Sequence, residues 1–197
     1  MINHKHKFIF IHTPKTAGTS ISVSLADDSV LKNETKEKHW NASQCKQNYS
    51  KYWNEYYKFS VVRNPWDRVV SMYIYFTQFN KTIKQKNFSD WLSFAFVEKK
   101  FNMWGGLGSQ YDFLAINKSI ELDYVLRFEN LNSDFNQLCE NLNICPPSLS
   151  TYNGPFKKEA HQHREHYGEY YNEYDMKIIE SAYKKDIKYF NYKFQQQ

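Results

Sequence analysis

The sequence is poor in cysteine, glycine and proline. Its 197 residues include three cysteines, six glycines and five prolines. Cys45, Cys139 and Cys145 form neither a C-x-x-C pair nor a zinc-binding spacing, which argues against a disulfide scaffold and a structural zinc site. An odd number of cysteines without such a pattern is typical of a reducing compartment.

Long apolar runs are also missing. No stretch reaches the roughly 18 apolar residues that a transmembrane helix needs, and the start of the sequence has no secretory signal pattern. We therefore expect a soluble, cytoplasmic protein without a transmembrane segment. It would act on cytoplasmic material or in peripheral contact with the inner face of the membrane.

Positive charge exceeds negative charge only modestly, with a formal net charge of +5. This balance favours anionic ligands. No basic run is interleaved with a recognition motif, so nucleic acid is not expected as a partner. The length fits one domain over residues 1–197, and a hydrophobic content of 41% is enough for a sizeable core.

The most informative segment lies near the N-terminus. An apolar run over 7–12 predicts a buried strand, and an amphipathic stretch over 18–27 predicts a helix. The turn between them carries Pro14, Lys15 and Gly18. A strand that enters a helix through such a turn brings main-chain N–H groups and the positive end of a helix dipole to one point, which is an anion site. Because the lysine precedes the glycine, this is not the G-x-x-x-x-G-K-[ST] loop of nucleoside triphosphatases.

Further strands and helices alternate along the chain. Strands are predicted at 58–63 and 122–128, and helices at 42–52, 65–79, 89–99, 133–142 and 172–188. This alternation predicts an α/β protein with a parallel sheet, whose ligands bind at the carboxyl ends of the strands. The turn-rich segment 102–117 is a candidate active-site loop.

A second anion site is predicted where the strand at 58–63 ends. Arg63 leaves this strand, and Ser71 follows about two turns into the next helix. Arginine can grip a phosphate with two parallel hydrogen bonds. The structural alternative is that Arg63 pairs with Asp67 and that Ser71 faces a helix neighbour.

The two motifs F-I-H-T-P-K-T-A-G-T-S and V-V-R-N-P-W-D-R-V-V-S together resemble those of sulfotransferases that use PAPS (3′-phosphoadenylyl sulfate). They are most similar to the carbohydrate group (sulfotransferase family 2), with its heparan 2-O- and HNK-1-type enzymes and many bacterial relatives. The segments K-H-W-N-A-S and Y-V-L-R-F-E-N-L resemble later blocks of that group in the same order. The resemblance covers about residues 7–194 and is weakest over 28–37 and 80–120.

The resemblance implies a three-layer α/β/α fold with a central parallel sheet, similar to P-loop nucleotide hydrolases. It implies that the first loop binds the 5′-phosphosulfate of PAPS and that Arg63 and Ser71 bind its 3′-phosphate. PAP is then the product, and no metal is expected. The loop residues concerned are Pro14, Lys15, Thr16, Ala17, Gly18, Thr19 and Ser20.

Two residues are the catalytic candidates that the resemblance implies. Lys15 would neutralise charge on the departing phosphate, and His39 matches the family's general base. An imidazole is well suited to proton abstraction near neutral pH. Glu55 and Glu129 are fallback bases, and His12 is expected to shape the loop or to contact phosphate.

The acceptor is the least defined partner. Relatives that act on sugars favour a carbohydrate hydroxyl, and Gln110 and Tyr111 match positions that line the acceptor cleft in relatives. The basic loop 150–168 could close over the nucleotide or the acceptor, or could be solvated. Its His161 and His163 have a metal-ligand spacing but no third ligand nearby. A P-loop-like kinase and a non-catalytic nucleotide-binding module remain the alternatives, and the oligomeric state stays open.

Overall fold

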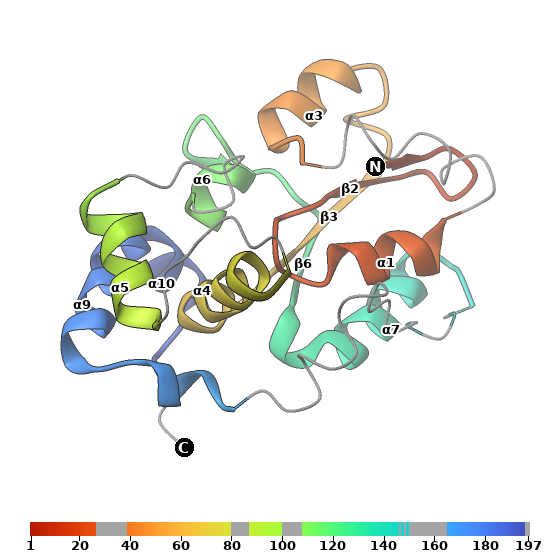
Figure 1. Ribbon diagram of the computed structural model, residues 1–197. Coiled ribbons are helices and arrows are strands. Elements are labelled where there is room, and N and C mark those ends of the chain that lie inside the picture. Colours follow the sequence, from red (N-terminus) through yellow and green to blue (C-terminus); the bar gives the residue numbers. More distant parts are fainter. Residues whose placement is uncertain are drawn as a thin grey trace. The chain divides into compact units, whose positions relative to one another are not determined.

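The computed structural model describes residues 1–26, 39–79, 87–99, 108–145, 147, 149 and 165–195. The chain forms two compact units (Figure 1). The first comprises Met1–Arg63 and Gln110–Tyr152, and the second comprises Asn64–Ser109 and Asn153–Gln197. The segment 28–37, where the resemblance is weak, and His161 and His163 lie outside the described residues.

The first unit is built on a four-stranded sheet. Its strands are β1 (Ile2–Asn3), β2 (Phe8–Ile11), β3 (Tyr57–Val62) and β6 (Tyr124–Arg127), in the order β1-β2-β3-β6. The pairs β2–β3 and β3–β6 are parallel, whereas β1 is antiparallel to β2. The predicted α/β class is confirmed, but the predicted parallel sheet is only mostly parallel, because β1 runs antiparallel to its neighbour. The short β1 strand was not predicted, because two residues carry no recognisable periodicity.

Both faces of this sheet are buried, which explains the continuous apolar run of β2. One face packs against α1 (Gly18–Leu25) and α7 (Leu131–Asn141). The opposite face lies on the side of α3 (Ala42–Asn48), which contacts β2. The core residues shared with α1 and α7 include Phe8, Phe10, Ile21, Leu25, Phe59, Val61, Leu126, Phe135 and Leu138.

The remaining elements of the first unit lie within or directly after the predicted active-site loop 102–117. Its described part is more regular than expected, because it contains α6 (Gln110–Leu114) and β4 (Ala115–Ile116). β4 pairs with β5 (Ser119–Ile120) in a short hairpin, and β6 leads into a 3₁₀ turn, η3 (Phe128–Asn130). Gly105, Gly106 and Gly108 precede this helix and are typical of a turn, so the sequence did not predict the helix.

The second unit is helical. Its helices are α4 (Pro65–Ile74), α5 (Phe88–Leu92), α9 (Glu173–Ala182) and α10 (Lys184–Phe190). Single helical turns extend it at η1 (Tyr75–Phe79), η2 (Ser93–Val97) and η4 (Tyr167–Tyr170). Pro65 opens α4 at the first residue of the predicted helix 65–79, whereas α5 begins one residue before the predicted start at 89 and is capped by Asn87. None of the described helices combines the length and the apolar character that are needed to cross a bilayer.

A buried polar cluster stabilises the second unit. The Arg68 guanidinium donates to the main-chain oxygen of Gly108 at 3.0 Å and faces the Tyr183 ring at 5.8 Å. Asp186 is fully buried and accepts a hydrogen bond from Ser109 at 2.5 Å. Burial lowers the pKa of Arg68 and raises the pKa of the Tyr183 phenol.

The raised pKa of Tyr183 predicts a loss of stability in alkaline solution. An unfolded chain releases the Tyr183 phenol proton at a pH of about 10, whereas the folded state keeps this proton to a higher pH. Stability from this group is therefore complete below pH ~10 and is lost as the pH rises toward the folded-state pKa. Linkage limits this contribution to about 1.4 kcal/mol per pH unit. In chemical unfolding between pH 9 and 11, Tyr183→Phe should flatten the fall in stability.

The exposed Tyr174, at 60% relative exposure, provides the control. Tyr174→Phe should leave the pH dependence of the unfolding free energy as steep as in the wild type. Equal slopes for the wild type and Tyr183→Phe would contradict the assignment.

Candidate active site

The loop between β2 and α1 has the backbone shape of an anion cradle. Lys15 and Ala17 adopt positive φ angles of 68° and 65°, whereas Thr16 between them does not. Such alternation turns successive main-chain N–H groups toward one concave side, and anions bind there. The loop ends at the first turn of α1, where the helix dipole adds positive potential.

Buried hydrogen bonds hold this loop against the sheet. The Thr16 hydroxyl donates to the main-chain oxygen of Thr13 at 2.8 Å. The Thr13 hydroxyl lies 3.0 Å from the Ser60 hydroxyl, which donates to the main-chain oxygen of Ile11 at 2.7 Å. Thr13, Thr16 and Ser60 are all fully buried. The hydroxyl of Thr16 is therefore used to shape the loop.

His12 fills the space beneath the start of α1. Its ring stacks on Phe10, with centroids 5.6 Å apart and planes inclined by 18°, and is 6% exposed. A Cβ at Gly18 would overlap the His12 imidazole. The expectation that His12 shapes the loop thus has a physical basis, because glycine at position 18 leaves room for this ring.

Gly18→Ala is expected to lower the unfolding free energy by about 1–3 kcal/mol, since the added methyl group forces His12 or the loop to move. Denaturant unfolding measures this loss. The double variant His12→Ala/Gly18→Ala isolates the cause, because a small side chain at position 12 removes the overlap. If Gly18→Ala lowers the unfolding free energy equally with and without the His12→Ala substitution, this explanation is contradicted.

His39 lies next to the same ring. The His12 and His39 centroids are 5.0 Å apart, with the planes inclined by 61°. His39 is two residues before Asn41, which forms a capping box with Gln44 through two hydrogen bonds of 2.9 Å. This cap defines the direction in which the chain enters α3. The structure therefore brings the predicted base to the predicted phosphate loop, with His12 as the contact between them.

Arg63 joins the end of β3 to the same loop. Its Nη1 donates to the main-chain oxygen of Lys15 at 3.2 Å, and its side chain is 5% exposed. The guanidinium carbon lies 3.8 Å from the centre of the Phe128 ring. The two predicted phosphate-binding segments thus meet through a direct contact between Arg63 and Lys15.

The other predicted residues occupy different positions. Ser71 is buried in α4 and belongs to the second unit. The β2–α1 loop lies at the edge of the sheet formed by the carboxyl ends of the parallel strands, called the loop edge below. Glu55 is exposed and precedes β3, so the length of a strand, on the order of 15–20 Å, separates it from this edge. This position argues against Glu55 as a base. Glu129 is exposed in η3, beyond the carboxyl end of β6 and so on the loop edge.

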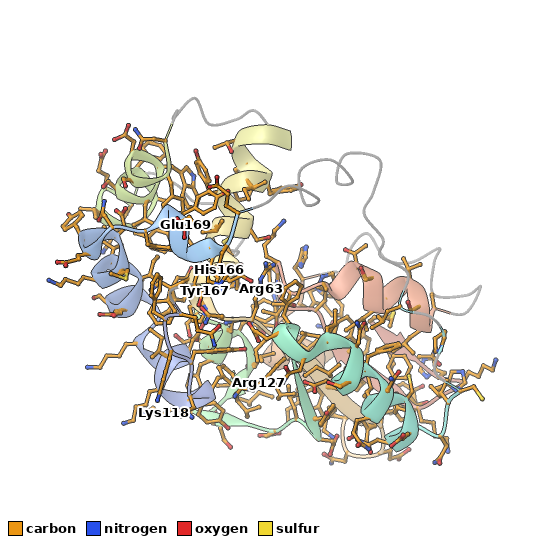
Figure 2. All side chains as sticks on the ribbon, turned by 90° about the horizontal axis from the view of Figure 1, so that it is seen from below. Arg63, Lys118, Arg127, His166, Tyr167 and Glu169 are labelled. Carbon is orange, nitrogen blue, oxygen red and sulfur yellow. The ribbon has the colours of Figure 1, made fainter. Side chains whose placement is uncertain are left out.

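Three further residues at this edge were missed or misread in the sequence. Gln110 is fully buried and bonds to Arg63, so it does not line an open acceptor cleft. Phe128 supports the Arg63 guanidinium. Arg127 ends β6 beside Val62, so two arginines leave neighbouring strands at one edge (Figure 2). The strand register reveals the position of Arg127, and contacts between distant segments reveal those of Gln110 and Phe128.

Comparison with known proteins finds a match among family models. Neither the curated proteins nor the solved structures contain a match to the chain. A family model described as "Sulfotransferase family" matches residues 1–193, which include the β2–α1 loop, His39 and Arg63. The chain therefore belongs to the sulfotransferase family.

Proposed function

We propose that the protein transfers a sulfuryl group from PAPS to a hydroxyl group of a carbohydrate, such as a polysaccharide, an oligosaccharide or a glycolipid, and releases PAP. The observation that carries this proposal is the contact of Arg63 with the loop at Lys15. It brings the two proposed anion-binding elements together, as a nucleotide with separate 5′ and 3′ phosphates requires. Family membership supports sulfuryl transfer as the chemistry.

The β2–α1 loop is the proposed site for the 5′-phosphosulfate. Its alternating backbone and the start of α1 offer main-chain donors, and Lys15 adds a positive charge. Thr19 and Ser20 lie in the first turn of α1 and supply hydroxyl groups at the same edge. These residues fit a phosphosulfate group, which is anionic and rich in hydrogen-bond acceptors.

Arg63 is the proposed ligand of the 3′-phosphate, with Ser71 as its partner. The guanidinium presents several N–H donors, and Nη1 donates to the main-chain oxygen of Lys15. Arginine matches the geometry of phosphate oxygens better than lysine does. The role of Ser71 rests on the resemblance of V-V-R-N-P-W-D-R-V-V-S to the family motif.

The proposed reaction is an in-line displacement at sulfur. PAPS, when bound, supplies the sulfuryl group and a phosphate leaving group. His39 accepts the proton of the acceptor hydroxyl as its oxygen forms the new bond to sulfur. Lys15 stabilises the negative charge that grows on the bridging oxygen as the old bond to sulfur breaks. The sulfuryl group has fewer charged oxygens than a phosphoryl group, so lysine and main-chain amides suffice without a metal ion.

The remaining expectations extend this proposal. The family match runs across both compact units, which supports residues 1–197 as one sulfotransferase domain with a P-loop-like nucleotide site. The protein is proposed to work in the cytoplasm or in peripheral contact with the inner face of the membrane. Its acceptor is a carbohydrate rather than nucleic acid.

Thermal unfolding with added nucleotides tests the proposal. PAP without Mg²⁺ should raise the melting temperature, because a ligand that binds only the folded state stabilises it. ATP with Mg²⁺ should have little effect. Strong stabilisation by ATP and Mg²⁺, with none by PAP, would instead identify a kinase-like phosphotransferase.

A further inference from the structure

The side-chain amide of Gln110 pairs with the main chain of Arg63. The Arg63 N–H donates to Gln110 Oε1 at 2.9 Å, and Gln110 Nε2 donates to the Arg63 oxygen at 2.8 Å. Gln110 is fully buried at the start of α6. One amide group thus satisfies both main-chain polar groups of the residue that follows β3.

This pairing occurs where the sheet no longer supports the chain. β2 ends at Ile11, which pairs with Ser60, so the residues after Ser60 extend beyond β2. On the other side, the last pair of the β3–β6 ladder is Val62 with Arg127. Gln110 therefore continues the hydrogen bonding of β3 by one residue and fixes the main-chain direction at Arg63.

The head group of Arg63 is restrained at its other end. It lies 3.8 Å from the Phe128 ring centre and donates to the Lys15 oxygen at 3.2 Å. Arginine stacks favourably on aromatic faces. With its main chain held by Gln110 and its guanidinium held by Phe128, the side chain loses little further freedom when it binds a ligand. Such preorganisation increases affinity without a new contact to the ligand.

Resting on the proposed function, we propose that Gln110 is a positioning residue for the 3′-phosphate of PAPS and that Phe128 supports it. Gln110 acts through Arg63 and does not touch the nucleotide itself. Its contribution is therefore specific to ligands that carry a 3′-phosphate. Two adenine nucleotides separate this role from a general structural one: PAP, with phosphates at the 5′ and 3′ positions, and 5′-AMP, which lacks the 3′-phosphate.

The experiment measures the affinities of PAP and 5′-AMP by calorimetry for the wild type, Gln110→Met, Phe128→Leu and Arg63→Met. The wild type should prefer PAP on the order of 10- to 100-fold, as expected for hydrogen bonds to a charged group. Arg63→Met should abolish this preference. Gln110→Met should reduce it at least about fivefold while 5′-AMP affinity stays within about twofold, because the 5′ site is intact.

Phe128→Leu keeps an apolar side chain and tests the same claim if Gln110→Met does not fold. It should also lower the preference for PAP. Gln137→Met is the matched control, since Gln137 is exposed on α7. The inference is overturned if Gln110→Met and Phe128→Leu keep the wild-type preference for PAP, or if they lower the affinities for PAP and 5′-AMP equally. A wild type that binds PAP no better than 5′-AMP overturns the proposed function itself.

Discussion

Replacing Lys15 with alanine is expected to lower kcat for sulfuryl transfer by about 10²–10³-fold, the usual cost of removing one group that stabilises charge in a transition state. The expected loss in PAP affinity is far smaller. Most donors of the β2–α1 loop are main-chain N–H groups, and the substitution leaves them in place. Initial rates with PAPS and calorimetry with PAP measure the two effects separately.

Lys7 offers a close control for this experiment. It also has a positive φ angle, 51°, and it is exposed in the turn before β2. Lys7→Ala therefore removes a lysine of the same backbone class and charge at the opposite end of β2. It should keep the wild-type kcat. Equal activity of Lys15→Ala and Lys7→Ala would remove Lys15 from the mechanism.

Replacing His39 with alanine should reduce kcat by about 10²–10⁴-fold, the range that general-base catalysis provides. PAP affinity should change little, because the base serves the acceptor hydroxyl. The wild-type rate should fall in acid as the imidazole takes up a proton, and the variant should lose this limb of its pH profile. Rates across the pH range, with PAP calorimetry, test both statements.

Added imidazole gives a second test of His39, because a free base can enter the space left by the ring and restore part of the rate. His6→Ala is the control, since His6 lies in the turn between β1 and β2, away from the loop edge. A His39→Ala enzyme with full activity, or with the wild-type acid limb, would show that another group takes the proton. Glu129 would then be the next candidate, since it lies at the loop edge of the sheet.

The sequence predicted the parts of the site that depend on local patterns. The apolar run of β2, the turn at Lys15 and the helix after Gly18 are consecutive, so a strand, a loop and a helix follow from their order. The cap of α3 is equally local, because Asn41 and its partner Gln44 are only three residues apart.

Contacts between distant segments could not be predicted in this way. Gln110 bonds to a residue 47 positions earlier, and Phe128 supports the same arginine from another strand end. Hydrophobic periodicity reports which face of an element is buried but not which distant residue meets it. Gln110 was therefore assigned to the acceptor cleft, whereas the structure buries it against Arg63.

Transfer of ³⁵S from labelled PAPS to a panel of glycans, without added metal, tests the central claim most directly. We expect at least one glycan to gain label while PAP appears in equal amount, and we expect Lys15→Ala to reduce both products together. Label that appears only as free sulfate, or label transfer that persists unchanged in Lys15→Ala, would contradict the proposed sulfuryl transfer at the β2–α1 loop.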